Sequence, residues 1–401
     1  MKQLLVAFLL LSSLSLEAQR RRPSAPPLTP QPIPNVTFGS PLPNLSAEHL
    51  AQWNAGRREF VDRRTMEEGL GPVFNGRSCG ECHNAPAAGG GAGRFVTRIA
   101  AIVDNVYHDL TEHGGALLQG AALSTREGAS HDFRNERVPA SATIIARRRS
   151  IPLFGLGLVD ATDDATFIAL AQQQGVQSPA TAGRVALVRN IVAGMKTVGK
   201  FGWKAQIATL QEFSGDAYLN ELGITNPLFP DENCPAGDCA ELAFNPVPGL
   251  NDTGERVDRS AAFMRFLGPP PRGRITAEVT AGEAVFSRIG CDSCHTPTLQ
   301  TGPNANPALH RVTYHPYSDF LLHDMGPLGD RIEQEAARGT EMRTPPLWGL
   351  RAVGLLLHDG SARSIDEAIL KHDGQGRGAR DRFEALNETD RAHLLAFLRS
   401  L

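Results

Sequence analysis

Cys79-Gly80-Glu81-Cys82-His83 and Cys291-Asp292-Ser293-Cys294-His295 repeat one pattern: two cysteines separated by two residues and followed directly by a histidine. With six cysteines and twelve histidines in 401 residues, random placement would rarely produce this pattern even once. Cys-x-x-Cys-His is the attachment sequence of c-type haem. One helical turn brings both thiols to the vinyl groups of one porphyrin edge and the histidine to the iron. We therefore expect two covalently bound haem c groups.

Two other kinds of site use the same residue types. A thioredoxin-like dithiol needs the two cysteines, but it does not require the histidine twice. A zinc site needs four ligands, and neither motif has a second pair of ligands nearby in the sequence. The pattern therefore favours haem, with His83 and His295 as the proximal iron ligands.

The two remaining cysteines are Cys234 and Cys239, in a stretch rich in Pro, Gly and Asp. In an oxidising compartment such a pair is expected to form a small-loop disulfide. We predict that bond here.

The sixth ligand of each iron decides whether a haem only transfers electrons or also binds a small molecule. For the second haem the candidates are His372, at the end of a short helix opened by Ser364, and Met325. Methionine is the usual partner of histidine in cytochromes c. The pattern alone leaves this choice open.

For the first haem, residues 84–150 offer His108, His113 and His131, and none of them stands in a recognisable ligand pattern. This favours an open or water-bound iron at the first motif. Two tryptophans in Gly- or Pro-framed turns, Trp203 and Trp348, are candidates for carrying electrons between the halves, although core packing is their commoner role.

Residues 1–18 have the charged start, apolar stretch and small-residue end of an export signal. The apolar stretch is too short to span a membrane comfortably, and no later segment is apolar enough to do so. We expect a periplasmic protein that does not span the membrane after cleavage. The net charge of -3 gives no indication of nucleic acid as a partner.

The periodicity predicts a mainly α-helical chain with long irregular loops. Residues 19–45 are Arg- and then Pro-rich and indicate a linker. A helix opened by Ser46 precedes the first motif, and a helix over about 276–289 precedes the second. The pattern predicts mainly helix over 140–225 and mostly irregular structure over 300–345, and a final helix is expected from about Thr389. Pro269-Pro270-Pro271 marks the boundary between the two halves.

The chain resembles the bacterial di-haem oxidoreductase family, whose members are called di-haem peroxidases or thiol oxidoreductases. It resembles more distantly the di-haem cytochrome c peroxidases and MauG-type enzymes. The matching segments are Gly69 to His83, Ile151 to Leu158, Gly199 to Ala205, Gly223 to Pro230, Arg343 to Arg351, Leu357 to Gly360 and Ala368 to His372.

This resemblance implies two cytochrome-c-like domains, over residues 46–265 and 266–401, with the haems facing the region between them. It places His372 where the peroxidases carry a methionine ligand, which favours His372 over Met325. It also implies an interdomain calcium. The distal histidine and glutamate of the peroxidases have no recognisable counterpart in this sequence.

The function expected from these features is a peroxidase-like oxidoreductase. Electrons from a small redox protein or a quinol pathway would enter at the second haem and reach hydrogen peroxide at the first. Two alternatives stay open. One is a pure electron-transfer cytochrome, and the other is a MauG-like oxidase that acts on a partner protein through a surface aromatic residue.

Overall fold

The structure is a computed structural model, and it describes residues 37–401. The expected export signal (1–18) and residues 19–36 of the linker lie outside this range. The end of the linker packs against the rest of the chain: the Leu42 side chain is buried, and its amide donates to the Phe266 carbonyl at 2.7 Å. The expected boundary between residues 46–265 and 266–401 stays a prediction.

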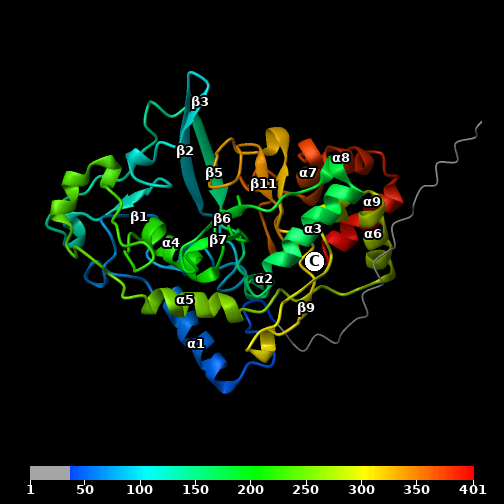
Figure 1. Cartoon of the computed structure of the whole chain (residues 1–401), viewed down its shortest axis with the longest axis horizontal. Coiled ribbons are helices and arrows are strands. Elements are labelled where there is room, and N and C mark those ends of the chain that lie inside the picture. The colour runs from blue at the N-terminus through cyan, green and yellow to red at the C-terminus, as the bar shows by residue number, and fades with distance from the viewer. Residues whose placement is uncertain (1–36) are drawn as a thin grey trace, which may run out of the picture. The chain divides into compact units, whose positions relative to one another are not determined.

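Helices make up 37% of the structure and strands 15%, so helix predominates as the periodicity predicts. The α-helices of the described residues are α1 (Ala47–Val61), α2 (Leu156–Asp160), α3 (Asp164–Gln177), α4 (Leu210–Leu222), α5 (Glu255–Phe266), α6 (Ala277–Arg288), α7 (Ile365–Leu370), α8 (Arg377–Glu384) and α9 (Glu388–Leu398) (Figure 1).

Strands are more frequent than the sequence indicates. They are β1 (Val73–Phe74), β2 (Phe95–Val103), β3 (Val106–His108), β4 (Ala121–Ala122), β5 (Ile144–Arg149), β6 (Leu187–Asn190), β7 (Met195–Val198), β8 (Leu299–Gln300), β9 (Thr313–Tyr314), β10 (Leu322–Asp324) and β11 (Glu341–Arg343). Strands β3, β2 and β5 form one antiparallel sheet, and the others pair two by two as β1–β4, β6–β7, β8–β9 and β10–β11.

The expectation of mainly helix over 140–225 is therefore wrong for β5 and for the β6–β7 hairpin. The expectation of mostly irregular structure over 300–345 is confirmed, although this segment also contains the short strands β9, β10 and β11. β2 has no period-2 burial pattern, and β5 ends in three consecutive arginines. Both features conceal a strand, because strands are recognised by alternation of apolar and polar residues.

The predicted helix starts are confirmed. The Ser46 side chain accepts a hydrogen bond from the His49 amide, and the Ser364 side chain accepts one from the Glu367 amide. Each hydroxyl satisfies an amide that the first turn of a helix leaves without a partner. The helices expected over 276–289 and from Thr389 are α6 and α9.

Two helix pairs are built alike, α1 against α5 and α6 against α9 (Figure 1). In the first pair a Cβ at Gly56 would overlap the Arg259 carbonyl, and one turn later Phe60 meets Phe263 with ring centroids 4.7 Å apart.

In the second pair a Cβ at Gly282 would overlap the His393 carbonyl, and Phe286 meets Phe397 at 5.2 Å. The spacing of four residues is the same on all four helices. Each pair crosses at a glycine, where the backbones approach closely. Each pair also places a phenylalanine beside a motif histidine: the ring centroids of Phe60 and His83 are 6.2 Å apart, and those of Phe286 and His295 are 6.4 Å apart.

Candidate haem sites

Each Cys-x-x-Cys-His motif opens into its own cavity. Cys79, Cys82 and His83 line the first, which we call the Cys79 cavity. Cys291, Cys294 and His295 line the second, the Cys291 cavity. The sequence therefore places the cysteines and the histidine of each motif at one hollow site.

Both motifs fold into the same single turn. In the first, the Cys82 and His83 amides donate to the Cys79 carbonyl at 3.2 and 3.1 Å. In the second, the Cys294 and His295 amides donate to the Cys291 carbonyl at 3.3 and 2.9 Å. This turn is the arrangement that the spacing predicts, and it presents two thiols and an imidazole to one cavity.

The motif histidines are held in the tautomer that a metal ligand requires. The Nδ1 atom of His83 lies 3.0 Å from the Gly90 carbonyl, and that of His295 lies 2.9 Å from the Tyr317 carbonyl. Because a carbonyl oxygen only accepts, Nδ1 carries the hydrogen and Nε2 keeps a free lone pair. Burial lowers the pKa of both imidazoles to about 4, so both are neutral at pH 7.

Cys79, Cys82 and Cys291 are not activated as thiolates. Burial raises the pKa of the Cys79, Cys82 and Cys291 thiols to about 12. A redox-active dithiol uses a thiolate whose pKa lies below the ordinary value. The electrostatics therefore argue against that alternative.

Basic side chains in the cavity walls suit a porphyrin, which carries two carboxylates. Arg149 lines both cavities, and its guanidinium donates to the carbonyls of Leu357 (2.9 Å) and Ser150 (3.3 Å). Arg343, in the wall of the Cys291 cavity, donates to the Gly202 carbonyl at 2.6 Å. Within residues 37–401 neither arginine has a carboxylate ion-pair partner. Burial lowers the pKa of both to about 10, which fits a site that awaits an anionic group.

A buried hydrogen-bond donor at the Cys291 cavity also indicates a site for a bound group. The Trp348 indole lines this cavity, and its Nε1 is buried without a hydrogen-bond partner among the described residues. Buried polar groups are normally hydrogen-bonded, so a free donor in a cavity wall indicates a bound group with an acceptor. The residues present at this site therefore fit a haem.

His372 and Met325, the two predicted candidates for the sixth ligand, line the Cys291 cavity together with His295. The His372 Nδ1 atom lies 2.7 Å from the Ala368 carbonyl, which again leaves Nε2 with a free lone pair. The Met325 methyl and the His372 ring are neighbours, since a Cβ at Gly376 would meet both at 3.2 Å. The choice between these two ligands stays a prediction.

Two further histidines, His323 and His358, also line the Cys291 cavity, and both ring nitrogens of His323 are engaged. Nε2 lies 2.8 Å from the Asp319 carboxylate, and Nδ1 lies 3.4 Å from the Cys294 sulfur. His323 therefore fixes Cys294 and is not free to bind iron.

The Cys79 cavity has no second histidine among the described residues that line it. His108 is exposed on β3, His113 lies next to Glu112, and His131 stacks on Phe244. None of these three predicted candidates reaches the cavity. Met264 of α5 packs in the core, and it also lines the wall of the Cys79 cavity.

Sequence reasoning missed the acidic side chains of the Cys79 cavity. Glu221 and Asp216 of α4 line it together with Arg98 of β2. The pKa of Glu221 is raised to about 7: burial and Asp216 raise it, and the hydrogen bond from Asn75 (3.0 Å) and Arg98 partly offset this increase. No motif marks these positions, because they come from a helix and a strand more than a hundred residues apart.

The two candidate tryptophans lie in different places. Trp203 lines both cavities, and its Nε1 donates to the Arg149 carbonyl at 2.9 Å. Trp348 lines only the Cys291 cavity. Their exposed fractions are 7% and 8%, so neither is a surface aromatic.

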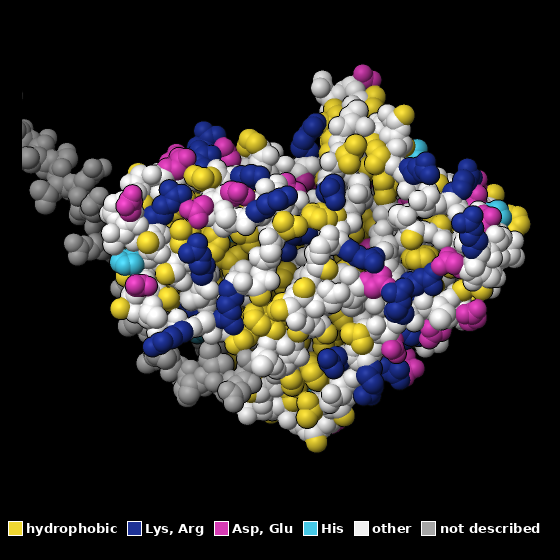
Figure 2. All heavy atoms as spheres, turned by 180° about the vertical axis from the view of Figure 1, so that it is seen from behind, with side chains coloured by type: hydrophobic (Ala, Val, Ile, Leu, Met, Phe, Trp, Pro, Cys, Tyr) yellow, Lys and Arg dark blue, Asp and Glu magenta, His cyan; other side chains and the backbone are white. Residues whose placement is uncertain are grey.

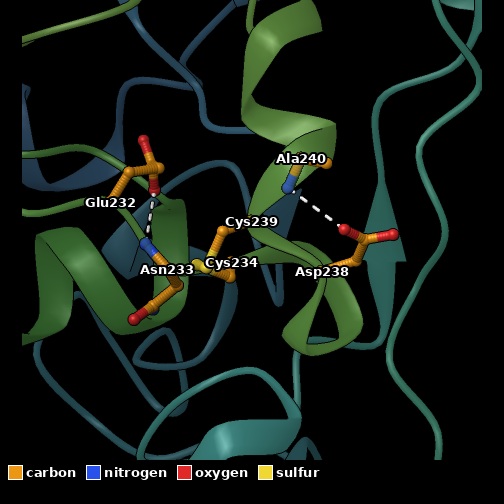
Figure 3. Close-up of a disulfide and its surroundings, with 6 residues drawn as sticks. All are labelled: Glu232, Asn233, Cys234, Asp238, Cys239 and Ala240. Carbon is orange, nitrogen blue, oxygen red and sulfur yellow. Dashed lines mark hydrogen bonds between the residues drawn. A yellow bond between two sulfur atoms is a disulfide. The ribbon is translucent and has the colours of Figure 1, made fainter.

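The predicted disulfide between Cys234 and Cys239 is confirmed (Figure 3). The Asp238 carboxylate accepts a hydrogen bond from the Ala240 amide at 3.0 Å, and this bond begins the short helix that carries Cys239. The disulfide lies away from both cavities, since neither of its cysteines lines them.

The predicted calcium finds no support in residues 37–401, where no group of three or more His, Cys, Asp or Glu side chains is placed to hold a metal ion. Over the same residues, no helix has the length and apolar character to cross a membrane. Acidic and basic side chains are interspersed on the face shown in Figure 2.

Two cavities that each contain a Cys-x-x-Cys-His turn, a neutral imidazole and unpaired guanidiniums define a di-haem protein. The chain belongs to the di-haem oxidoreductase family: the model of that family, described as "Di-haem oxidoreductase, putative peroxidase", matches residues 120–401. This match contains the second motif but not the first. The family resemblance expected from the sequence is confirmed, and the protein is a haem-dependent oxidoreductase of the peroxidase type.

A search of curated protein sequences found no match. Solved structures with a similar course of the chain include hydrazine synthase of Kuenenia stuttgartiensis, at 14% identity over 100% of both chains and a TM-score of 0.41. A MauG-like protein associated with microbial copper homeostasis matches at 15% identity over 93% of this chain and 94% of the other, with a TM-score of 0.41. The diheme peroxidase BthA of Burkholderia thailandensis matches at 16% identity over 88% and 86%, with a TM-score of 0.39. Similarities this distant say nothing about substrate or mechanism.

Proposed function

We propose that this chain reduces hydrogen peroxide at the Cys79 cavity with electrons that enter at the Cys291 cavity. One observation carries the proposal. A second imidazole with a free Nε2, that of His372, lines the Cys291 cavity, whereas no second histidine among the described residues lines the Cys79 cavity. Two imidazoles suit electron transfer, and a haem iron with an exchangeable sixth position supplies redox chemistry for a small oxidant.

The proposal includes covalent haem c at both motifs. Cys79, Cys82, Cys291 and Cys294 would form the thioethers, His83 and His295 would be the proximal ligands, and His372 would be the sixth ligand at the second site. The shared turn, the free Nε2 atoms and the neutral thiols support this assignment. Mass spectrometry of the denatured chain tests it, because two haems must remain attached after unfolding.

Reduction of hydrogen peroxide to two water molecules consumes two electrons and two protons, and a proton must leave one oxygen and reach the other. A carboxyl group that titrates near pH 7 can both accept and return a proton. Glu221 has this property, and the Asn75 amide orients it. We assign it the proton transfer, with Arg98 in the same cavity to balance negative charge.

Trp203 is the aromatic side chain placed for electron passage between the cavities, because it lines both of them. A small redox protein or a quinol pathway would supply the electrons. A MauG-like oxidation of a partner through Trp203 or Trp348 is not favoured, since both are buried.

We place the protein in the periplasm. The Cys234–Cys239 disulfide supports this location, because structural disulfides persist in oxidising compartments. Fractionation of the producing cells, with N-terminal sequencing of the mature chain, tests both the location and the cleavage near residue 18.

Rapid mixing of the fully reduced protein with hydrogen peroxide tests the function. We expect both haems to oxidise within the mixing experiment, and the ferric protein to show one high-spin and one low-spin haem. Two low-spin haems that bind no carbon monoxide when reduced, and that peroxide oxidises only slowly, would instead establish a pure electron-transfer cytochrome.

A further inference from the structure

A buried ammonium group follows directly after Trp203. The Lys204 side chain has an exposed fraction of 0%. Its Nζ atom lies within hydrogen-bond distance of four oxygen atoms, which are the carbonyls of Arg338 (3.1 Å), Gly339 (3.1 Å) and Glu341 (2.6 Å) and the carboxylate of Asp330 (3.0 Å). We call these four oxygens the Lys204 cage. One carboxylate and three carbonyls form the kind of oxygen shell in which hard metal cations are bound.

The Asp330 carboxylate of the cage also pairs with an arginine of β5. Asp330, whose side chain is 2% exposed, also accepts from the Arg148 guanidinium at 2.6 Å. Burial raises the pKa of Asp330, but Arg148 and Lys204 outweigh it and lower the pKa below its ordinary value. The carboxylate is thus ionised and holds two cations from different segments.

The cage fixes the loop that supports Trp203. The chain runs from Asp330 past the Arg338 and Gly339 carbonyls into β11, which begins at Glu341 and ends at Arg343. The Arg343 amide donates to the Trp203 carbonyl at 2.8 Å, and its guanidinium donates to the Gly202 carbonyl. The same strand places Met342 and Arg343 in the wall of the Cys291 cavity. Lys204 therefore binds this loop at Asp330 and over residues 338–341, and Trp203 contacts it at Arg343.

We propose that Lys204 is a built-in cation that does the work of a bound metal ion, locking residues 330–343 onto the turn at Trp203 and so positioning this indole between the two cavities. It is a positioning residue. Its effect on electron passage rests on the proposed function, whereas its effect on the order of the loop does not.

Replacement of Lys204 by methionine keeps the volume of the side chain but removes the ammonium, which is the donor to the Glu341 carbonyl at 2.6 Å and a second donor to the other three oxygens of the cage. Buried acceptors that lose their donor destabilise the segments that carry them. The loop over 330–343 should loosen, and Trp203 with it. Lys200→Met is the matched control, because Lys200 is also buried, on the same segment, and binds the Thr162 carbonyl (3.0 Å) and Asp164 (3.1 Å) away from the loop.

Two measurements on the holoprotein test the proposal. Hydrogen–deuterium exchange should rise in peptides covering 330–343 of Lys204→Met, and not in those peptides of Lys200→Met. After a short reducing pulse, electron transfer between the two haems should slow roughly tenfold in Lys204→Met, with haem content unchanged. Unchanged exchange and an unchanged rate in Lys204→Met would overturn the proposal.

Chemical rescue and chelation add two further arms. Lys204→Ala should regain intersite electron transfer on addition of propylammonium, which replaces the deleted atoms, and not on addition of propanol, which has the same size without the charge. If Lys204→Met does not fold, this pair decides, and equal effects of both compounds would overturn the proposal. In the natural protein EGTA should change neither rate nor exchange, and a loss restored by calcium would show that a metal ion has this role. Peroxide turnover by the natural protein tests the proposed function separately.

Discussion

The helix pairs α1/α5 and α6/α9 place the same elements beside the two motifs, a glycine crossing, a phenylalanine and a one-turn Cys-x-x-Cys-His segment, yet the cavities that they border differ. The Cys291 cavity is lined by His372 and Met325, and His323 fixes one of its cysteines. The Cys79 cavity is lined instead by the carboxyl groups of Glu221 and Asp216 and by Arg98. A common scaffold thus holds two sites, and the segments added to it determine their chemistry.

The added segments have different origins. α4 and β2 supply Glu221, Asp216 and Arg98 to the Cys79 cavity, and the region around α7 supplies His372 to the Cys291 cavity. Trp203 belongs to both cavities. This arrangement predicts that changes in one group of segments alter one site and leave the other intact.

The largest effect is expected from Glu221→Gln, which removes the titrating group of the Cys79 cavity. Peroxide turnover should fall by about 10²–10⁴-fold, the usual contribution of a general acid–base group. The natural protein should show an ionisation near pH 7 in its pH–rate profile, and the variant should lack it. Spectra of the haem at Cys291 should not change.

Glu212→Gln is the matched control, since Glu212 is a buried carboxyl of the same helix that does not line the cavity. A loss of turnover as large as in Glu221→Gln would mean that any disturbance of α4 is sufficient. Stability should also respond to pH. The folded-state pKa of about 7 lies above the ordinary 4.5, so the stability that this group contributes is complete below pH 4.5 and is lost as the pH rises through 7.

The difference between the two sites also marks the limit of sequence reasoning. The helix caps at Ser46 and Ser364 and the Cys234–Cys239 bond depend on neighbours within a few residues, and these expectations are confirmed, whereas haem attachment at the two motifs stays a prediction. The acidic wall around Glu221 arises because residues of α4, β2 and the first motif border the same cavity, an arrangement that no local pattern encodes.

Strand β5 was missed for a similar reason. Its arginines make the end of the strand look like an exposed polar segment. Yet Arg148 is only 3% exposed, because it pairs with Asp330, which lies 182 residues further along the chain. Arg147 covers the Phe95 ring at 4.5 Å. Long-range partners make these positions compatible with a strand, and they are visible only once the chain is folded.

A second prediction sharpens the contrast at the iron. His372→Ala should convert the haem at Cys291 from low spin to high spin, while the haem at Cys79 keeps its signal. Electron paramagnetic resonance of the ferric protein measures this change. Met325→Ala, next to His372 in the same cavity, is the control and should leave both signals as they are. The reverse pattern would assign the sixth ligand to Met325.

The smallest effect concerns what the two sites share. Gly56→Ala and Gly282→Ala each add a methyl group where a neighbouring helix backbone leaves no room, and should destabilise the fold by about 1–3 kcal/mol. Gly175→Ala is the control, because Gly175 lies in α3 with open space around it, and alanine should stabilise that helix by up to about 1 kcal/mol.

Thermal unfolding followed at each haem band separates two cases. If residues 46–265 and 266–401 are independent domains, each glycine variant lowers the melting temperature at its own haem only. If both variants lower one common transition, the two helix pairs unfold as one cooperative unit, and the predicted boundary at Pro269 is not a domain boundary in the thermodynamic sense.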